Sequence, residues 1–138
     1  MKLTIEMPWE RDLSVNSYRF GKPSPKAKGK WKKRRVRKPH VQAWMQRCAS
    51  DIYVARIEAE GLFSAFPCCA SEGSPVVVRI DFRFPDKRRR DTHNYFKVIC
   101  DAVASSLGID DKDIRISTRS VTVDSENPGF TIEVRDER

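Results

Sequence analysis

The sequence predicts a mixed α/β (α+β) domain in which a β-sheet of about four strands is covered by two helices. Two patterns predict it: several segments alternate polar with apolar residues, as strands do, and two others repeat apolar residues at helical spacing. The chain has 138 residues, the length of one domain with its own core, so residues 1–138 are expected to form a single domain. The expected order of elements is β-α-β-α-β-β.

The first half of the chain holds one strand and one helix. Residues 2–7 alternate polar with apolar side chains, as in a half-buried strand. Pro39 suits the first turn of a helix, after which apolar residues recur at helical spacing. Gly61 is a natural end for that helix. Residues 62–75 show no clear period and are expected to form a connection.

The second half holds the clearest strand, residues 76–84, in which apolar side chains alternate with charged ones. A helix is expected from about residue 92 to residue 107, ended by Gly108. Residues 114–123 read as a strand with a change of register, because the parity of the apolar positions shifts along it. After a turn, residues 130–134 provide one apolar face of a final strand.

Charge is concentrated in one segment. The chain has 27 Lys and Arg against 19 Asp and Glu, a net charge of +8, and ten of these cations lie between Lys22 and Lys38 with no acid among them. We call residues 22–38 the basic arm and expect it to be flexible and to contact nucleic-acid phosphate. A solvated tail or targeting signal is the alternative. The arm cations expected on DNA are Lys30, Lys32, Lys33, Arg34 and Arg35.

Aromatic residues lie within and just before the basic arm. Trp9, Tyr18, Phe20 and Trp31 are able to stack on exposed bases or to pack into the domain, and the sequence leaves both readings open.

Other features of the sequence exclude several classes of protein. No window has about 18 consecutive apolar residues, and the first twenty residues contain acids and no apolar core of a secretory signal, so a basic intracellular domain is expected. The four cysteines form no C-x-x-C pair, and neither histidine lies near two of them at zinc-finger spacing. The thiols of Cys48, Cys68, Cys69 and Cys100 are therefore expected to be buried or uninvolved in chemistry.

The most informative stretch joins the central strand to the second helix. Four cations, Lys87, Arg88, Arg89 and Arg90, stand between Asp86 and Asp91. Such carboxylates often only form ion pairs, and Asp91 is also placed to cap the helix. Within the helix, three polar residues spaced by four lie together, opposite a broad apolar arc: His93, Lys97 and Asp101.

A second acidic cluster, Asp110 to Asp113, follows Gly108. If the chain returns beside the helix, the carboxylates of Asp91, Asp110 and Asp111 and the imidazole of His93 would form a site suited to Mg²⁺. Bound divalent cations promote phosphodiester hydrolysis, and Lys97 is placed to neutralise charge on the phosphate. Acids to hold metal beside cations to hold phosphate predict a nuclease.

The stretch from Phe84 to Asn94, together with Lys97, Asp101-Ala102-Val103 and Ile109-Asp110-Asp111, resembles the RusA family of Holliday-junction resolvases. The resemblance is strong over residues 76–116 and looser elsewhere, including Asn16, Tyr18 and Arg19. These are small endodeoxyribonucleases, often carried by phages and prophages. The resemblance implies a cytoplasmic homodimer that makes paired, Mg²⁺- or Mn²⁺-dependent cuts in branched DNA during recombination and repair. It implies no membrane partner and no small-molecule cofactor.

Residue by residue, the resemblance assigns the first metal-binding aspartate to Asp91, the late one to Asp111 and the catalytic lysine to Lys97. Asp110 neighbours Asp111, and the two roles are exchangeable. His93 stands where the best-known form of the family pattern has aspartate, whereas some phage-type relatives resemble this chain in having Asp-x-His-Asn. The imidazole removes one negative charge and leads us to expect a preference for Mn²⁺. The implied DNA contacts also include Lys87, Arg88, Arg89 and Arg90. The alternative function is an inactive basic protein that coats or holds branched DNA or RNA.

Overall fold

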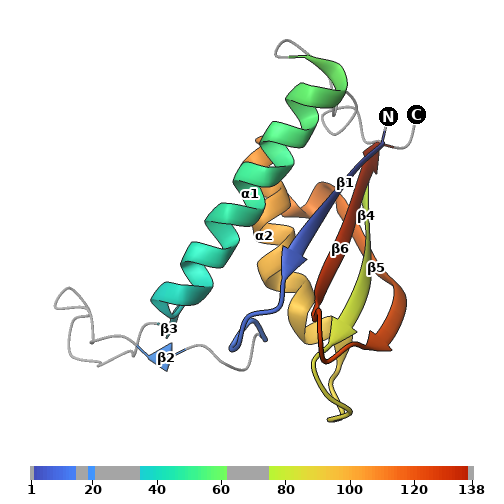
Figure 1. Ribbon diagram of the computed structural model, residues 1–138. Helices are drawn as coiled ribbons and strands as arrows, with labels where there is room; N and C mark the ends of the chain where they lie inside the picture. Colours follow the sequence, from blue (N-terminus) through green and yellow to red (C-terminus); the bar gives the residue numbers. More distant parts are fainter. Residues whose placement is uncertain (1, 15–18, 21–34, 62–74, 137–138) are drawn as a thin grey trace, which may run out of the picture.

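In a computed structural model, residues 2–14, 19–20, 35–61 and 75–136 are described. Two helices cover one face of a four-stranded sheet, which confirms the predicted fold class (Figure 1). The strands of this sheet are β1 (Lys2–Pro8), β4 (Val76–Phe84), β5 (Ile114–Val123) and β6 (Gly129–Asp136), and the helices are α1 (Pro39–Glu60) and α2 (Phe96–Leu107).

The sheet is mixed, with strand order β1-β6-β4-β5. β4 and β5 run parallel, as a crossover through α2 requires, and the other neighbours are antiparallel. The predicted change of register in β5 is confirmed: Ile80 pairs with Thr118 but Asp81 pairs with Ser120, so Arg119 is the extra residue of a bulge.

The core lies between the helices and the sheet. Along β4 the apolar side chains that alternate with Arg79, Asp81 and Arg83 are buried, as the pattern predicts. α1 contributes a buried stripe at helical spacing, made of Val41, Trp44, Cys48 and Ile52. The indole of Trp44 also donates a 2.8 Å hydrogen bond to the carbonyl oxygen of Pro8, which joins α1 to the end of β1.

Three short elements differ from the expectation. The helix predicted from residue 92 begins as a 3₁₀ helix, η3 (Thr92–Tyr95), before α2 takes over. A second 3₁₀ turn, η4 (Asp111–Asp113), precedes β5. A two-residue antiparallel ladder joins β2 (Arg19–Phe20) to β3 (Arg35–Val36). This ladder brings together the residues on either side of the segment 21–34. Nearly all of that segment belongs to the basic arm, which is predicted to be flexible, and it lies outside the described residues.

The described cysteines fit the prediction of chemically uninvolved thiols. Cys48 is fully buried and Cys100 half-buried, and both are free. Burial raises the pKa of Cys48 to about 12 and that of Cys100 to about 11. Cys68 and Cys69 lie outside the described residues. In the part of the chain that the structure describes, no helix is long and apolar enough to cross a membrane.

Candidate active site

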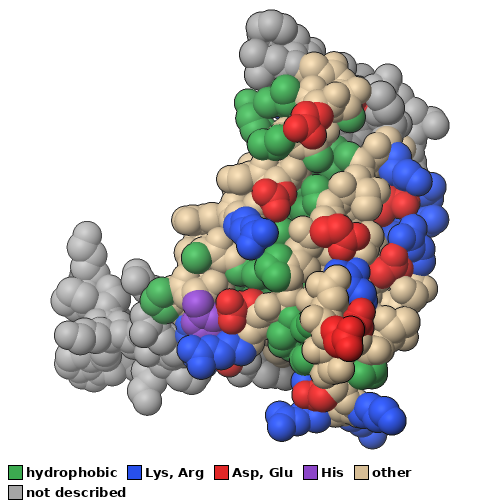
Figure 2. Space-filling view, in the orientation of Figure 1, with side chains coloured by type: hydrophobic (Ala, Val, Ile, Leu, Met, Phe, Trp, Pro, Cys, Tyr) green, Lys and Arg blue, Asp and Glu red, His purple; other side chains and the backbone are tan. Residues whose placement is uncertain are grey.

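A loop rich in arginine, residues 85–90, projects from the end of the sheet where β4 stops (Figure 1). Lysine and arginine side chains gather at this projecting end (Figure 2). Asp86 holds the loop by accepting hydrogen bonds from the backbone N–H of Arg88 (2.9 Å) and from the Arg90 guanidinium (2.7 Å). These bonds, that of Arg90 first, lower the pKa of Asp86 to about 2. Lys87, Arg88 and Arg89 remain exposed.

Arg90 differs from the three cations before it. Its guanidinium lies 5.2 Å from the ring centroids of both Trp9 and Phe84, and its side chain is 15% exposed, against 84% for Arg88. Arg90 thus fastens the loop to an aromatic cluster. The sequence expectation that Arg90 contacts DNA beside its neighbours stays a prediction.

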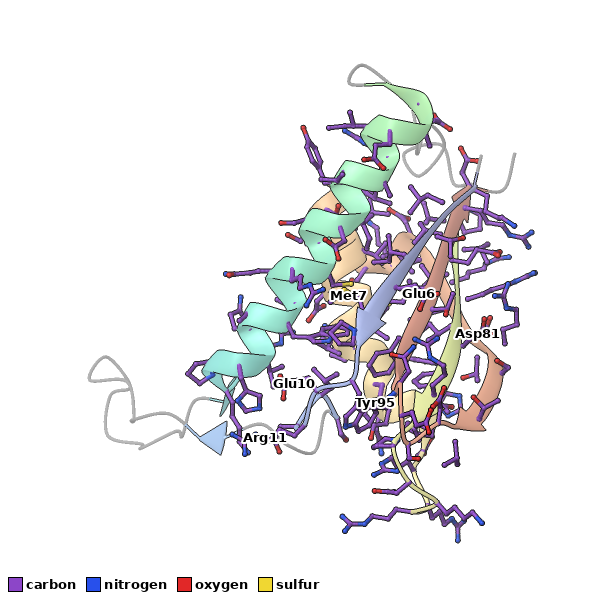
Figure 3. The ribbon with its side chains drawn as sticks, in the orientation of Figure 1. Glu6, Met7, Glu10, Arg11, Asp81 and Tyr95 are labelled. Carbon is purple, nitrogen blue, oxygen red and sulfur yellow. The ribbon has the colours of Figure 1, made fainter. Side chains whose placement is uncertain are left out.

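Trp9 belongs to that aromatic cluster. Its ring lies between 5.5 and 5.7 Å from the rings of Phe84, Tyr95 and Phe130, centroid to centroid. Tyr95 lies at the end of the sheet from which the loop projects (Figure 3). Of the two readings that the sequence left open for Trp9, packing into the domain is the one the structure gives.

Asp91 both caps η3 and remains open to solvent. Its Oδ1 accepts a 3.0 Å hydrogen bond from the backbone N–H of His93 and lies 3.2 Å from Nδ1 of the same residue. The side chains of Asp91 and His93 are both more than half exposed. The hydroxyl of Thr118 on β5 donates to the hydroxyl of Thr92 at 3.0 Å, which fixes η3 against the sheet. The capping role and a solvent-facing carboxylate therefore coexist.

Lys97 lies one turn further along, between two carboxylates. Its Nζ is 3.0 Å from Oδ1 of Asp101 and 3.5 Å from Oδ2 of Asp111. The hydrogen bond to Asp101 is the main cause that raises the pKa of Lys97. Asp111 reaches this position because Gly108 adopts the left-handed conformation at φ 67° and reverses the chain after α2. The acidic cluster therefore does return beside the helix, and the contact it makes is with Lys97.

Asp110 serves as the cap of η4. Its Oδ1 accepts a 3.2 Å hydrogen bond from the backbone N–H of Lys112, and this bond, followed by one with Asp111, lowers the pKa of Asp110. Both aspartates are exposed. Asp110 is thus a turn-forming carboxylate, whereas Asp111 faces Lys97.

The expected metal ligands have suitable donor chemistry. Three carboxylates and one imidazole are the donors of a hard or borderline divalent cation, and all four side chains are more than half exposed. They stand as two pairs, Asp91 with His93 and Asp110 with Asp111. Within the described ranges, no three His, Cys, Asp or Glu side chains gather where they could hold a metal ion. The residues therefore fit a divalent cation by donor type, but the described structure does not gather three of them at one point.

Sequence reasoning missed the contact between Lys97 and Asp111 and a second ion pair of this region. Arg37, between β3 and α1, pairs with Oδ2 of Asp101, the residue whose Oδ1 meets Lys97. The spacing of Lys97 and Asp101 signals their own contact, but nothing in the sequence signals a partner 64 residues away. Besides the four cations of the loop, the expected DNA contacts Arg19 and Arg35 belong to the β2–β3 ladder, and six others lie outside the described residues: Asn16, Tyr18, Lys30, Lys32, Lys33 and Arg34.

Two comparisons with known proteins bear on this region. The family model described as endodeoxyribonuclease RusA matches residues 20–135 of the chain. The matched range includes the arginine-rich loop, η3, α2 and η4. A search of the curated proteins finds no match.

Proposed function

Because the chain belongs to the RusA family of endodeoxyribonucleases, we propose that it cuts four-way DNA junctions in a reaction that requires a divalent metal ion. The observation that carries the proposal is the position of Lys97, held between Asp101 and Asp111 one turn after the Asp91–His93 pair. Carboxylates, a lysine and exposed cations are the combination that phosphodiester hydrolysis needs, and the loop of cations directly precedes Asp91 in the chain.

The residues divide the work by charge. Lys87, Arg88 and Arg89 contact backbone phosphates on either side of the cut, since their side chains project into solvent. The ammonium of Lys97 faces the phosphate to be cleaved and offsets the charge that develops there. Asp91, His93, Asp110 and Asp111 are the residues that would hold the metal ion. When bound, Mg²⁺ or Mn²⁺ supplies an activated water and stabilises the departing 3′-oxygen.

His93 stands where the best-known form of the RusA pattern has aspartate. A neutral imidazole brings less negative charge than a carboxylate and is a softer ligand, so we propose that Mn²⁺ supports cutting better than Mg²⁺. The 3.2 Å contact between Nδ1 of His93 and Asp91 supports this role, because it holds the imidazole next to a carboxylate.

The symmetry of the substrate also bears on the number of subunits in the protein. Two symmetric cuts in one junction need two active sites, so we propose a homodimer with one site in each subunit. The reaction then serves recombination and repair of DNA in a bacterial cytoplasm, on host or phage DNA.

One observation favours a second candidate. The metal ligands stand as two pairs, and no group of three forms in the described part of the chain. A protein that holds branched DNA without cutting it would need the cations alone. It would not need Asp111 beside Lys97, which is why cutting remains our preferred function.

The test compares a labelled four-way junction with a linear duplex of the same sequence, each with Mg²⁺, Mn²⁺ or EDTA. We expect paired cuts near the crossover, in the junction only, and none in EDTA. Tight junction binding without cuts in either metal would establish the second candidate instead. Equal cutting of the linear duplex would remove the claim of junction specificity.

A further inference from the structure

Four side chains of alternating charge form a continuous row beside α2. Arg37 pairs with Oδ2 of Asp101, Oδ1 of Asp101 lies 3.0 Å from Nζ of Lys97, and the same Nζ lies 3.5 Å from Oδ2 of Asp111. The row begins at Arg37, near the C-terminal end of the basic arm, and ends on the acidic turn η4. Asp101 is its only member that contacts two cations from different elements.

Burial divides this row into a covered end and an open end. The side chains of Arg37 and Asp101 are 24% and 20% exposed, whereas those of Lys97 and Asp111 are 49% and 52% exposed. The covered pair is less screened by water, so its geometry is the better fixed. Lys97 by itself has a flexible four-carbon stem and a compact charge that many rotamers satisfy. Its closer and less exposed partner is Asp101.

We propose that Asp101 is a positioning residue that holds the Lys97 ammonium toward the scissile phosphate, and that Arg37 holds Asp101 in turn. This inference rests on the proposed function, since it gives Lys97 a phosphate to face. Asp101 uses a different oxygen for each cation, so it keeps Lys97 in place even when Asp111 is engaged by a metal ion. The row also connects the C-terminal end of the basic arm to the active site.

The test uses six variants of the full-length protein: Asp101→Asn, Lys97→Met, the double variant of these two, Arg37→Lys, Arg37→Met, and Asp51→Asn as the matched control. Asp51 forms an i,i+4 pair with Arg47 on α1, so its substitution makes the same charge change in a helical ion pair away from α2. Junction affinity is measured in EDTA, single-turnover cutting at saturating protein with metal, and stability by thermal unfolding.

We expect Asp101→Asn to slow single-turnover cutting by about 10- to 100-fold, because small displacements of a reacting group have effects of that size. Its junction affinity should stay within about twofold of that of Asp51→Asn, and Asp51→Asn should cut at the wild-type rate. The double variant should cut no more slowly than Lys97→Met, because Asp101 acts through Lys97. Arg37→Lys should lose less activity than Arg37→Met.

Two results of the cutting assay would overturn the inference: wild-type cutting by Asp101→Asn, or a double variant slowed by the product of the two single effects. A second readout does not depend on cutting. The side-chain ammonium signal of Lys97 in ¹⁵N-lysine-labelled protein should be sharp in the wild type and lost in Asp101→Asn. If the wild type cuts no junction, the proposed function fails, but the ammonium signal still tests whether Asp101 holds Lys97. A sharp Lys97 signal that persists in Asp101→Asn would refute that Asp101 holds Lys97.

Discussion

The arginine-rich loop makes a prediction that separates two roles among neighbouring cations. Arg88 and Arg89 are exposed, whereas Arg90 is covered by Trp9 and Phe84 and bonded to Asp86. Replacing Arg88 and Arg89 together by Gln should therefore remove phosphate contacts and leave the fold intact. Replacing Arg90 alone by Gln should weaken the fold and leave most of the phosphate contacts.

The magnitudes follow from these contacts. Each lost phosphate contact reduces the slope of log affinity against log salt by about 0.9, so the Arg88→Gln/Arg89→Gln variant should lose about 1.8. When the salt concentration rises from 50 to 200 mM, the factor by which its affinity falls should then be about ten times smaller than the factor for the wild type. Arg90→Gln removes two cation–π contacts and an ion pair with Asp86, whose side chain is 43% exposed. The loss of the two cation–π contacts should lower the free energy of unfolding by roughly 1–2 kcal/mol.

Fluorescence anisotropy of a labelled junction in EDTA, from 50 to 300 mM KCl, measures the slope without cutting. Denaturant unfolding of the same variants measures stability. An unchanged slope in Arg88→Gln/Arg89→Gln would show that these side chains are not on the DNA. The division of roles would be refuted if Arg90→Gln kept the wild-type stability while the slope of its log affinity against log salt fell by about 0.9, the value of one phosphate contact.

Three further predictions concern the core, the thiols and the metal. Phe82 is fully buried against the rings of Phe84 and Phe130, so Phe82→Ala should lower the free energy of unfolding by about 3–5 kcal/mol in denaturant melts. The raised pKa values of Cys48 and Cys100, about 12 and 11, keep both thiols protonated at pH 8. Peptide mapping after iodoacetamide treatment should find both unmodified in the native protein and alkylated after denaturation. His93→Asp should shift the preference of cutting from Mn²⁺ toward Mg²⁺, and equal Mn²⁺-to-Mg²⁺ rate ratios in the two proteins would contradict the role given to the imidazole.

The strands and helices were predictable because the burial of one face makes apolar residues recur in the sequence at the period of a strand or a helix. The alternation of β4 and the parity change opposite Ile80 and Asp81 both appear in the structure as predicted. The 3₁₀ start of the second helix was not predictable, because the apolar period of a single turn does not distinguish 3₁₀ from α geometry. The Thr92–Thr118 hydrogen bond that fixes this turn joins two separate elements.

The candidate site was predictable in its residue types and less so in its contacts. The sequence shows four similar cations from Lys87 to Arg90, and the contacts of Arg90 with the rings of Trp9 and Phe84 and with Asp86 make the last of them different. The pairing of Asp101 with Arg37 depends in the same way on how α2 meets the segment before α1. The return of Asp111 to Lys97 could be conjectured from Gly108, but the side chain that it meets could not.

The most direct test of the account is single-turnover cutting of a four-way junction by aspartate-to-asparagine variants. Asp91→Asn and Asp111→Asn should bind the junction at least as tightly as the wild type, since each removes a negative charge near phosphate, and should fail to cut it. Asp86→Asn and Asp113→Asn make the same charge change beside them and should still cut at saturating protein. Wild-type cutting by Asp91→Asn would contradict the central claim that these carboxylates carry the reaction.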